Sequence, residues 1–156
     1  TLPLDLDTPL AELRGGPAKE ALSEAWRLPG ARLGHIHLHV SDLQRSERFY
    51  EHVLGLEVKL RWHGASFLSA GGYHHHVGLN VWAGRGAPPP PPNSVQLRAF
   101  SLRLSRQGLE ALEAHLRELG LAYERTEGLG TGAEALALSD PDGNRIIAEA
   151  AEARVY

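Results

Sequence analysis

The chain has 156 residues, of which 42% are hydrophobic and 22% charged, and its formal net charge is -3. This length suits one domain with a real core, and the composition is that of a soluble globular protein rather than a disordered or fibrous one. The slightly acidic balance, with no run of Lys and Arg, argues against a nucleic acid or an anionic membrane as partner. A small molecule is the expected partner.

Cysteine is absent from the sequence, which excludes disulfides and thiolate metal sites. Any transition metal must therefore be held by histidine and carboxylate. No apolar run approaches 18 residues and the N-terminus lacks the basic and apolar regions of an export signal, so we expect a cytoplasmic protein. The chain begins at Thr1 rather than Met, as a piece of a longer protein would.

Residues 1–31 are rich in Pro and Gly and are expected to be a lead-in or linker segment. The next stretch, "LGHIHLHV", alternates apolar and polar residues and predicts a strand. A helix is predicted over "SDLQRSERFYEHVLG", with Ser41 and Gln44 as a capping box and Gly55 as the stop. Two or three strands should follow, at about 56–62, 66–70 and 74–82, with Gly71 and Gly72 as the turn before the last.

Five prolines in residues 84–94 predict a stiff, extended linker. The pattern then repeats: a strand over "RAFSLRLS", a helix with leucines at 109, 112, 116 and 119, and strands near 121–126, 133–138 and 145–150. The segment "DPDGN" at 140–144 is the turn before the last strand. Residues 151–156 are left as a C-terminal tail.

The repeat predicts an α+β fold with two tandem βαβββ modules inside a domain at 32–150. Module one covers 33–83 and module two covers 95–150. Two such modules can form a curled mixed sheet around a cleft, with the helices outside and polar residues lining the cleft. Chemistry is expected in that cleft.

Six of the nine histidines fall in two clusters, one at 35, 37 and 39 and the other at 74, 75 and 76. Alternation places the first three on one face, opposite the apolar Ile36, Leu38 and Val40. The same test sends His74 and His76 inward and His75 outward, although a bulge after the glycine turn reverses that assignment. Imidazole suits both metal ligation and proton transfer near neutral pH.

Each of these residues can instead have a purely structural role. A single histidine in a strand is more often a hydrogen-bonded structural residue than a ligand, but two clusters on neighbouring strands make a site an equal alternative. Glu149 is the candidate carboxylate, on the same strand face as Ile147; its alternative is a solvent-exposed charge.

The segments "GHIHLHVSDLQRSERFYEHVLGLEV", "SAGGYHHHVGLNVW" and "DPDGNRI" together resemble the vicinal-oxygen-chelate superfamily of glyoxalases, bleomycin-resistance proteins and extradiol dioxygenases. The resemblance is greatest to the C-terminal half of catechol-2,3-dioxygenase-like proteins. It implies paired βαβββ modules around a divalent metal, Fe(II) first, with Mn(II) or Zn(II) as alternatives, and an aromatic diol as substrate. The first metal ligand falls on His35. The acid–base histidine falls on His75, whereas the strand-face argument favours His76.

Two expected ligands are missing, because the second histidine of the family falls at Ala99 and its glutamate at Ile147. His37 and Glu149 lie two residues further along their strands, on the same faces. A shifted site would therefore draw its metal ligands from His35, His37, His76 and Glu149, with His75 and His76 as the catalytic candidates. The glutamate that glyoxalase isomerisation needs would fall near Gly78, which disfavours that reaction.

The main functional hypothesis is an extradiol ring-cleaving oxygenase, or half of one. The alternatives are a metal-free module that binds a small molecule, as bleomycin-resistance proteins do, and the non-catalytic half of a two-domain dioxygenase. The expected protein partners are a second copy of the chain or an N-terminal half.

Overall fold

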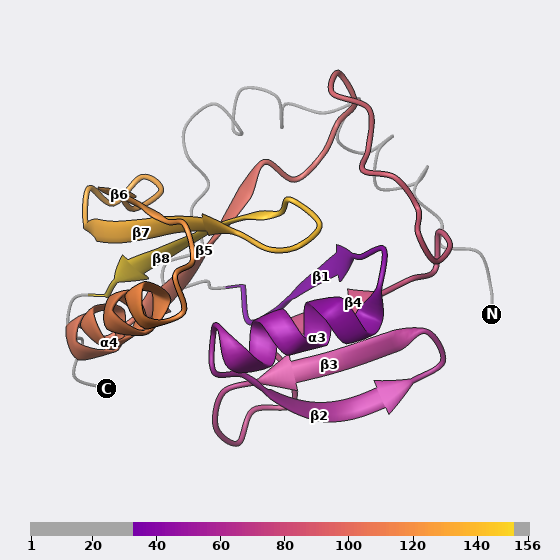
Figure 1. Ribbon diagram of the computed structural model, residues 1–156, viewed down its shortest axis with the longest axis horizontal. Helices are drawn as coiled ribbons and strands as arrows, with labels where there is room; N and C mark the ends of the chain where they lie inside the picture. The colour runs from indigo at the N-terminus through magenta and orange to yellow at the C-terminus, as the bar shows by residue number, and fades with distance from the viewer. Residues whose placement is uncertain (1–32, 152–156) are drawn as a thin grey trace, which may run out of the picture. The chain divides into compact units, whose positions relative to one another are not determined.

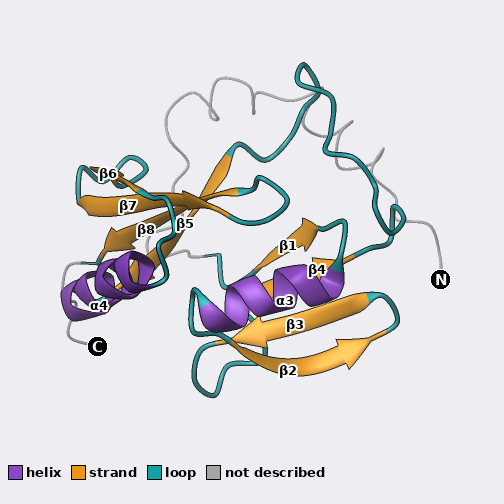
Figure 2. Ribbon diagram, viewed as in Figure 1, coloured by secondary structure: helices purple, strands orange, loops and turns teal. Residues whose placement is uncertain are grey.

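The computed structural model describes residues 33–151, and the predicted lead-in segment at 1–31 lies outside the described residues. The first module contains β1 (Ile36–His39), α3 (Leu43–His52), β2 (Glu57–Trp62), β3 (Ala65–Ser69) and β4 (Val77–Asn80). The second contains β5 (Ala99–Leu104), α4 (Arg106–Glu118), β6 (Glu124–Glu127), β7 (Glu134–Ser139) and β8 (Arg145–Ala150). Figure 2 shows the two sets of strands, each with one helix.

Both modules form a four-stranded mixed sheet with the same topology (Figure 1). The strand order is β1-β4-β3-β2 in one sheet and β5-β8-β7-β6 in the other. In each sheet the first and last strands of the module pair in parallel, and the remaining neighbours are antiparallel. The predicted α+β fold with two tandem βαβββ modules is therefore confirmed.

One face of each sheet packs on its helix because apolar residues alternate along the strands. Leu38 and Val40 are buried next to exposed His37 and His39. The main core combines residues of both modules, including Tyr50 of α3, Leu116 of α4 and Ile146 of β8. This leaves the opposite strand faces for polar residues and, in the first module, for histidines.

The turn between β7 and β8 contacts the first helix through two buried or half-buried carboxylates. Tyr50 donates a hydrogen bond to Asp140 across 2.9 Å. Asp142 accepts from the amide and hydroxyl of Ser41, from Ser46 and from Arg45. Burial alone would raise the pKa of the Asp142 carboxyl, but these hydrogen bonds and the charge of Arg45 hold it below its usual range.

Two local predictions need correction. Asp42, rather than Ser41, caps α3 by accepting from the amide of Arg45, since the Ser41 hydroxyl is bound to Asp142. The last strand of the first module begins only at Val77, so His74, His75 and His76 precede it. Gly55 does end the helix region in a left-handed conformation, with φ +69.

Within residues 33–151, no helix is long and apolar enough to cross a membrane.

Candidate functional site

The two histidine clusters meet at one end of the first sheet. His35 directly precedes β1, and the triple histidine directly precedes β4, the strand that pairs with β1. Two backbone hydrogen bonds fix this meeting: the amide of Ile36 donates to the His76 carbonyl at 3.0 Å, and the amide of His76 donates to the Leu68 carbonyl at 2.8 Å. The backbone thus holds the segment before β4 between β1 and β3.

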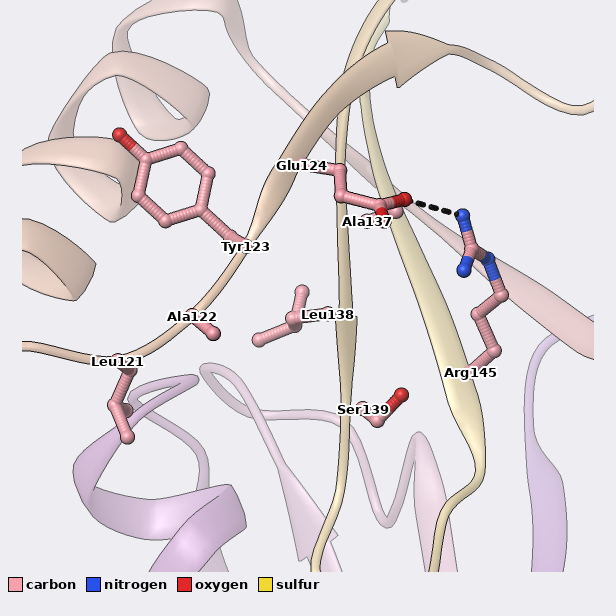
Figure 3. Close-up of a pocket in the computed structure, with 8 residues that line it drawn as sticks. All are labelled: Leu121, Ala122, Tyr123, Glu124, Ala137, Leu138, Ser139 and Arg145. Carbon is pink, nitrogen blue, oxygen red and sulfur yellow. Dashed lines mark hydrogen bonds and ion pairs between the residues drawn. The ribbon is translucent and has the colours of Figure 1, made fainter.

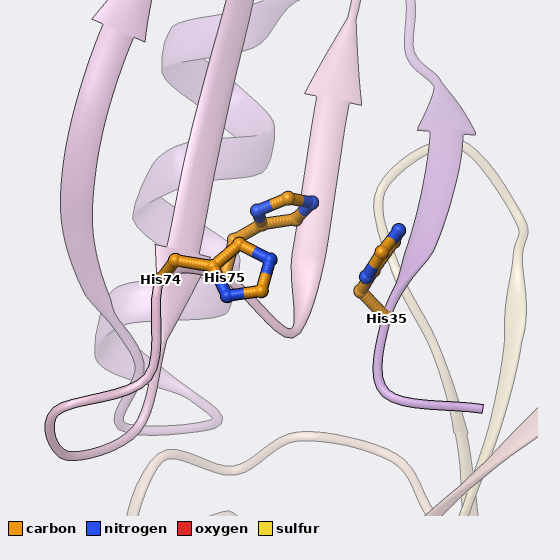
Figure 4. A group of neighbouring side chains, drawn as sticks. All are labelled: His35, His74 and His75. Carbon is orange, nitrogen blue, oxygen red and sulfur yellow. The ribbon is translucent and has the colours of Figure 1, made fainter. Parts of the chain in front are cut away.

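His35, His74 and His75 form a compact group (Figure 4). One ring nitrogen of each lies within 4.8 Å of those of the other two. The ring centroid of His75 is 4.5 Å from that of His35 and 4.5 Å from that of His74. His35 and His74 are exposed and His75 is half-buried, so the group is open to solvent on one side.

His75 points toward the histidines of β1, contrary to the alternation prediction. Its Nε2 lies 3.2 Å from Nε2 of His37, and its ring contacts Phe67 at 5.0 Å between centroids. Alternation failed because these residues form a bend rather than a strand, which is the reversal that a bulge would also produce. Burial and then the neighbouring histidines, His35 first, lower the pKa of His75 below its usual range.

His76 is held by the end of β3. Its Nδ1 accepts a hydrogen bond from the amide of Ala70 at 3.2 Å and lies 2.9 Å from the Ser69 hydroxyl. A backbone amide can only donate, so Nδ1 of His76 is an acceptor and the ring proton is on Nε2. His76 therefore presents an N–H and no free lone pair.

The two remaining histidines of β1 lie further along the strand. His37 packs over Gly78, where a β-carbon would come within 3.0 Å of the imidazole. His39 pairs with Asn80 in the parallel register, two residues beyond the His37–Gly78 pair. The predicted common face of His37 and His39 is thus present, but the structure brings only His37 into contact with the triple histidine.

Glu149 lies in the second module and is fully engaged there. It is 1% exposed and accepts from Arg103 Nε at 2.9 Å and from the Thr131 hydroxyl at 3.1 Å. On the same sheet face, Ile147 packs with Ala99, Ala135 and Ala137 in a small apolar cluster. Among the described residues, no carboxylate joins the histidine group.

Tyr73 and Gly34 also shape the site, and sequence reasoning missed both. The Tyr73 ring lies 4.2 Å from that of His74 and 4.8 Å from that of His76. Its hydroxyl sits against Gly34, where a β-carbon would be only 2.6 Å away. In the sequence, a glycine directly precedes His35 and an aromatic residue directly precedes His74, and this pattern could have indicated their contact.

Two open pockets lie elsewhere. One of about 410 Å³ is lined by β6, β7 and the start of β8, where Arg145 forms an ion pair with Glu124 at 2.9 Å (Figure 3). Another lies beside Glu47, which accepts hydrogen bonds from Arg61 and Ser66. Neither is lined by a histidine.

The histidine group of the first module fits a divalent metal, whereas the ligand positions that the resemblance implies in the second module do not. Histidine ligands bind zinc at roughly 2.0–2.1 Å, which places neighbouring ligand nitrogens roughly 3–3.5 Å apart. The ring nitrogens of the three imidazoles lie within 4.8 Å of one another, which is wider than that spacing, and the side chains are exposed or half-buried and so have room to rotate toward an ion. The ligand positions implied at Ala99 and Ile147 do not fit, because both side chains lack a donor atom and pack in an apolar cluster.

Comparison with known proteins adds two curated relatives. A catechol-2,3-dioxygenase from Bacillus subtilis (strain 168) is 47% identical over 98 residues, which are 61% of this chain and 34% of the relative. The chain thus spans about a third of that protein's length. The glutathione transferase FosA from Serratia marcescens is 31% identical over 73% of this chain and 77% of the relative.

Solved structures share the fold. A lactoylglutathione lyase from Agrobacterium tumefaciens matches with a TM-score of 0.58 and 22% identity, over 79% of this chain and 96% of its own. A glyoxalase/dioxygenase from Nostoc punctiforme matches with a TM-score of 0.60 and 19% identity, over 83% and 99%. Residues 32–147 match the sequence model of one family. This chain belongs to the Glyoxalase/Bleomycin resistance protein/Dioxygenase superfamily.

Proposed function

We propose that the chain is a metal-dependent, catechol-2,3-dioxygenase-like ring-cleaving oxygenase, or the half of one that carries the metal. The observation that carries this proposal is the group of three imidazoles at the start of β1 and before β4. His35 is the ligand at the position implied by the family resemblance. The 47% identity to a catechol-2,3-dioxygenase supports an aromatic diol as the substrate class.

Fe(II) is the metal we propose first. When bound, it supplies an electrophilic centre for the two oxygens of a vicinal diol and a redox partner for dioxygen. Mn(II) and Zn(II) are also compatible with imidazole ligands, and Zn(II) has no redox chemistry of its own.

The proton-handling role falls to His76 rather than to His75. The Ala70 amide fixes the His76 proton at Nε2, which makes this ring a hydrogen-bond donor to a substrate oxygen. His75 has a different place, between His35 and His37, with which it is in ring contact. Phe67 borders His37 and His75 and offers an aromatic surface to a planar ring.

Because the chain spans about a third of the dioxygenase relative, the complete active enzyme would contain a further pair of modules or a second copy of the chain. We propose association with such a partner in the cytoplasm. Sedimentation of the purified chain with and without Fe(II) distinguishes a monomer from a homodimer.

Anaerobic loading with Fe(II), followed by addition of catechol and dioxygen, tests the proposed activity. The expected result is oxygen uptake with formation of a yellow ring-cleavage product, lost in His35→Ala and kept in His39→Ala. Oxygen uptake that does not require Fe(II), or that His35→Ala leaves intact, contradicts the proposal.

The apolar cluster around Ile147 favours a second candidate, a metal-free module that binds a small molecule. Ala99 and Ile147 remove the ligands of the family from the second module and replace them with hydrocarbon surface. Calorimetry with catechol in the presence and absence of a chelator separates the two candidates. Binding that the chelator does not change supports the metal-free module and contradicts the oxygenase.

A further inference from the structure

Five histidines lie at or near one end of the first sheet, His39 lies at the far end of β1, and the contacts of each decide whether it can hold a metal. A ligand needs a ring nitrogen with a free lone pair that points to the same place as those of its partners. His35, His74 and His75 are the three whose ring nitrogens lie within 4.8 Å of one another, close enough to share one ion once the rings turn toward it (Figure 4).

His76 does not meet it. Its Nδ1 lone pair is taken by the amide of Ala70, which leaves the proton on Nε2. Moving that proton to Nδ1 would place two N–H groups face to face. His76 is therefore a neighbour of the metal group and not a member of it.

His37 is a partner of one ligand. Its Nε2 lies 3.2 Å from Nε2 of His75, so Nδ1 of His75 is the nitrogen that remains free for a metal. Histidine ligands almost always donate their other ring N–H to a fixed acceptor, which orients the ring. Gly78 makes room for this acceptor, since a β-carbon there would come within 3.0 Å of the His37 ring.

In the second module, the strand face that carries Ala99, Ile147 and Glu149 offers no free metal ligand. Both carboxylate oxygens of Glu149 are engaged, one by Arg103 and one by Thr131, and Gly128 lies so close that a side chain there would clash with Glu149. Ala99 and Ile147 have no donor atoms. The second module therefore supplies no side-chain donor at the two ligand positions that the resemblance implies.

We propose that this chain holds its metal in the first module alone, through His35, His74 and His75, with His37 as the positioning residue of His75. The ligand set is independent of the proposed function, and only the role of the metal in ring cleavage rests on it. Three neutral imidazoles leave the full double charge on the ion, whereas a carboxylate would neutralise part of it. Such a set favours Co(II), Ni(II), Cu(II) and Zn(II) over Mn(II).

The test is metal binding by the full chain. Co(II) is added while its visible absorption is recorded, and Zn(II) binding is measured by calorimetry. Replacement of His35, His74 or His75 by alanine should weaken binding about 100-fold or more, and His37→Ala about 10-fold. Two matched controls, His39→Ala on the same strand and Glu149→Gln in the second module, should stay within about twofold of the unchanged chain.

Thermal unfolding of the metal-free variants shows whether each one folds. If His74→Ala alone fails to fold, His74→Gln replaces it, because an amide keeps the bulk of the ring and is a poor ligand for Co(II) and Zn(II). Undiminished binding in a folded His74 variant, or a large loss in Glu149→Gln, overturns the assignment. Intact metal binding without catechol cleavage contradicts the proposed function and supports the assignment.

Discussion

The imidazole of His37 lies so close to Gly78 that a β-carbon on residue 78 would be 3.0 Å from the ring. A side chain larger than hydrogen at position 78 would therefore crowd the His37 ring. A side chain at position 78 and the His37–His75 hydrogen bond compete for the same space.

Gly78→Ala should therefore displace His37 and weaken metal binding about tenfold by freeing His75 to rotate. The crowding should also lower the free energy of unfolding by about 1–3 kcal/mol. Metal titration and urea denaturation measure the two effects. Gly72→Ala is the matched control, since nothing lies within 4 Å of a β-carbon there. Equal metal affinity of the two variants would contradict this role for His37.

The contact between Tyr73 and Gly34 gives a second prediction. In Gly34→Ala the new β-carbon would be 2.6 Å from the Tyr73 hydroxyl, so the Tyr73 ring must shift from its present place beside His74. We expect weaker Co(II) binding and a changed visible spectrum. Adding Tyr73→Phe removes the clashing oxygen and should restore both, because the next ring atom lies at an ordinary 3.6 Å. A double variant no better than Gly34→Ala would show that the clash is not the cause.

The apolar cluster of the second module predicts that position 147, where the resemblance implies a glutamate ligand, cannot accept a glutamate without loss of stability. Ile147 is 3% exposed and packs with alanines, so Ile147→Glu buries a carboxylate among hydrocarbon groups. The free energy of unfolding should fall by roughly 3 kcal/mol or more. Ile147→Leu keeps the volume and should cost less than about 1.5 kcal/mol. Denaturant unfolding of both variants checks the difference, and a stable Ile147→Glu would contradict a closed apolar cluster.

Acid stability should depend on Glu113 of α4. Hydrogen bonds from Arg125 first, and also from Tyr123, lower the pKa of Glu113 to about 2 against the opposing effect of burial. The unfolded chain therefore binds a proton more readily, at about pH 4.3, and the stabilisation from this carboxylate is lost as the pH falls from there toward 2.

Glu113→Gln should accordingly lose less stability than the unchanged chain over that pH range. Glu110→Gln, an exposed carboxylate on the same helix, should follow the unchanged chain. Urea unfolding at a series of pH values provides the comparison. Parallel curves for Glu113→Gln and the unchanged chain would contradict a lowered pKa for Glu113.

Local patterns were sufficient to predict the fold. Apolar alternation predicted β1, turn residues and the repeat of the first module's pattern predicted the other strands, and the leucine spacing from Leu109 to Leu119 predicted α4. The start of α3 was misplaced by one residue because Ser41 is bound to Asp142, which is 101 positions away and invisible to a local capping rule.

The site was only partly predictable for the same kind of reason. Alternation placed His37 and His39 correctly because they lie within β1, but it failed at His75, which precedes β4. The hydrogen bond from Ala70 that fixes the His76 ring depends on the end of a neighbouring strand. The engagement of Glu149 by Arg103 likewise needs the register of β5 and β8.

X-ray absorption spectroscopy of the Co(II)-loaded chain tests the three-histidine metal site directly, because it reports the number and type of ligands around the metal. We expect three imidazole ligands, with the remaining positions filled by light atoms from solvent. One of the three imidazoles should disappear in His74→Ala. A spectrum with only one imidazole, or one unchanged in His74→Ala, would contradict a metal site formed by His35, His74 and His75.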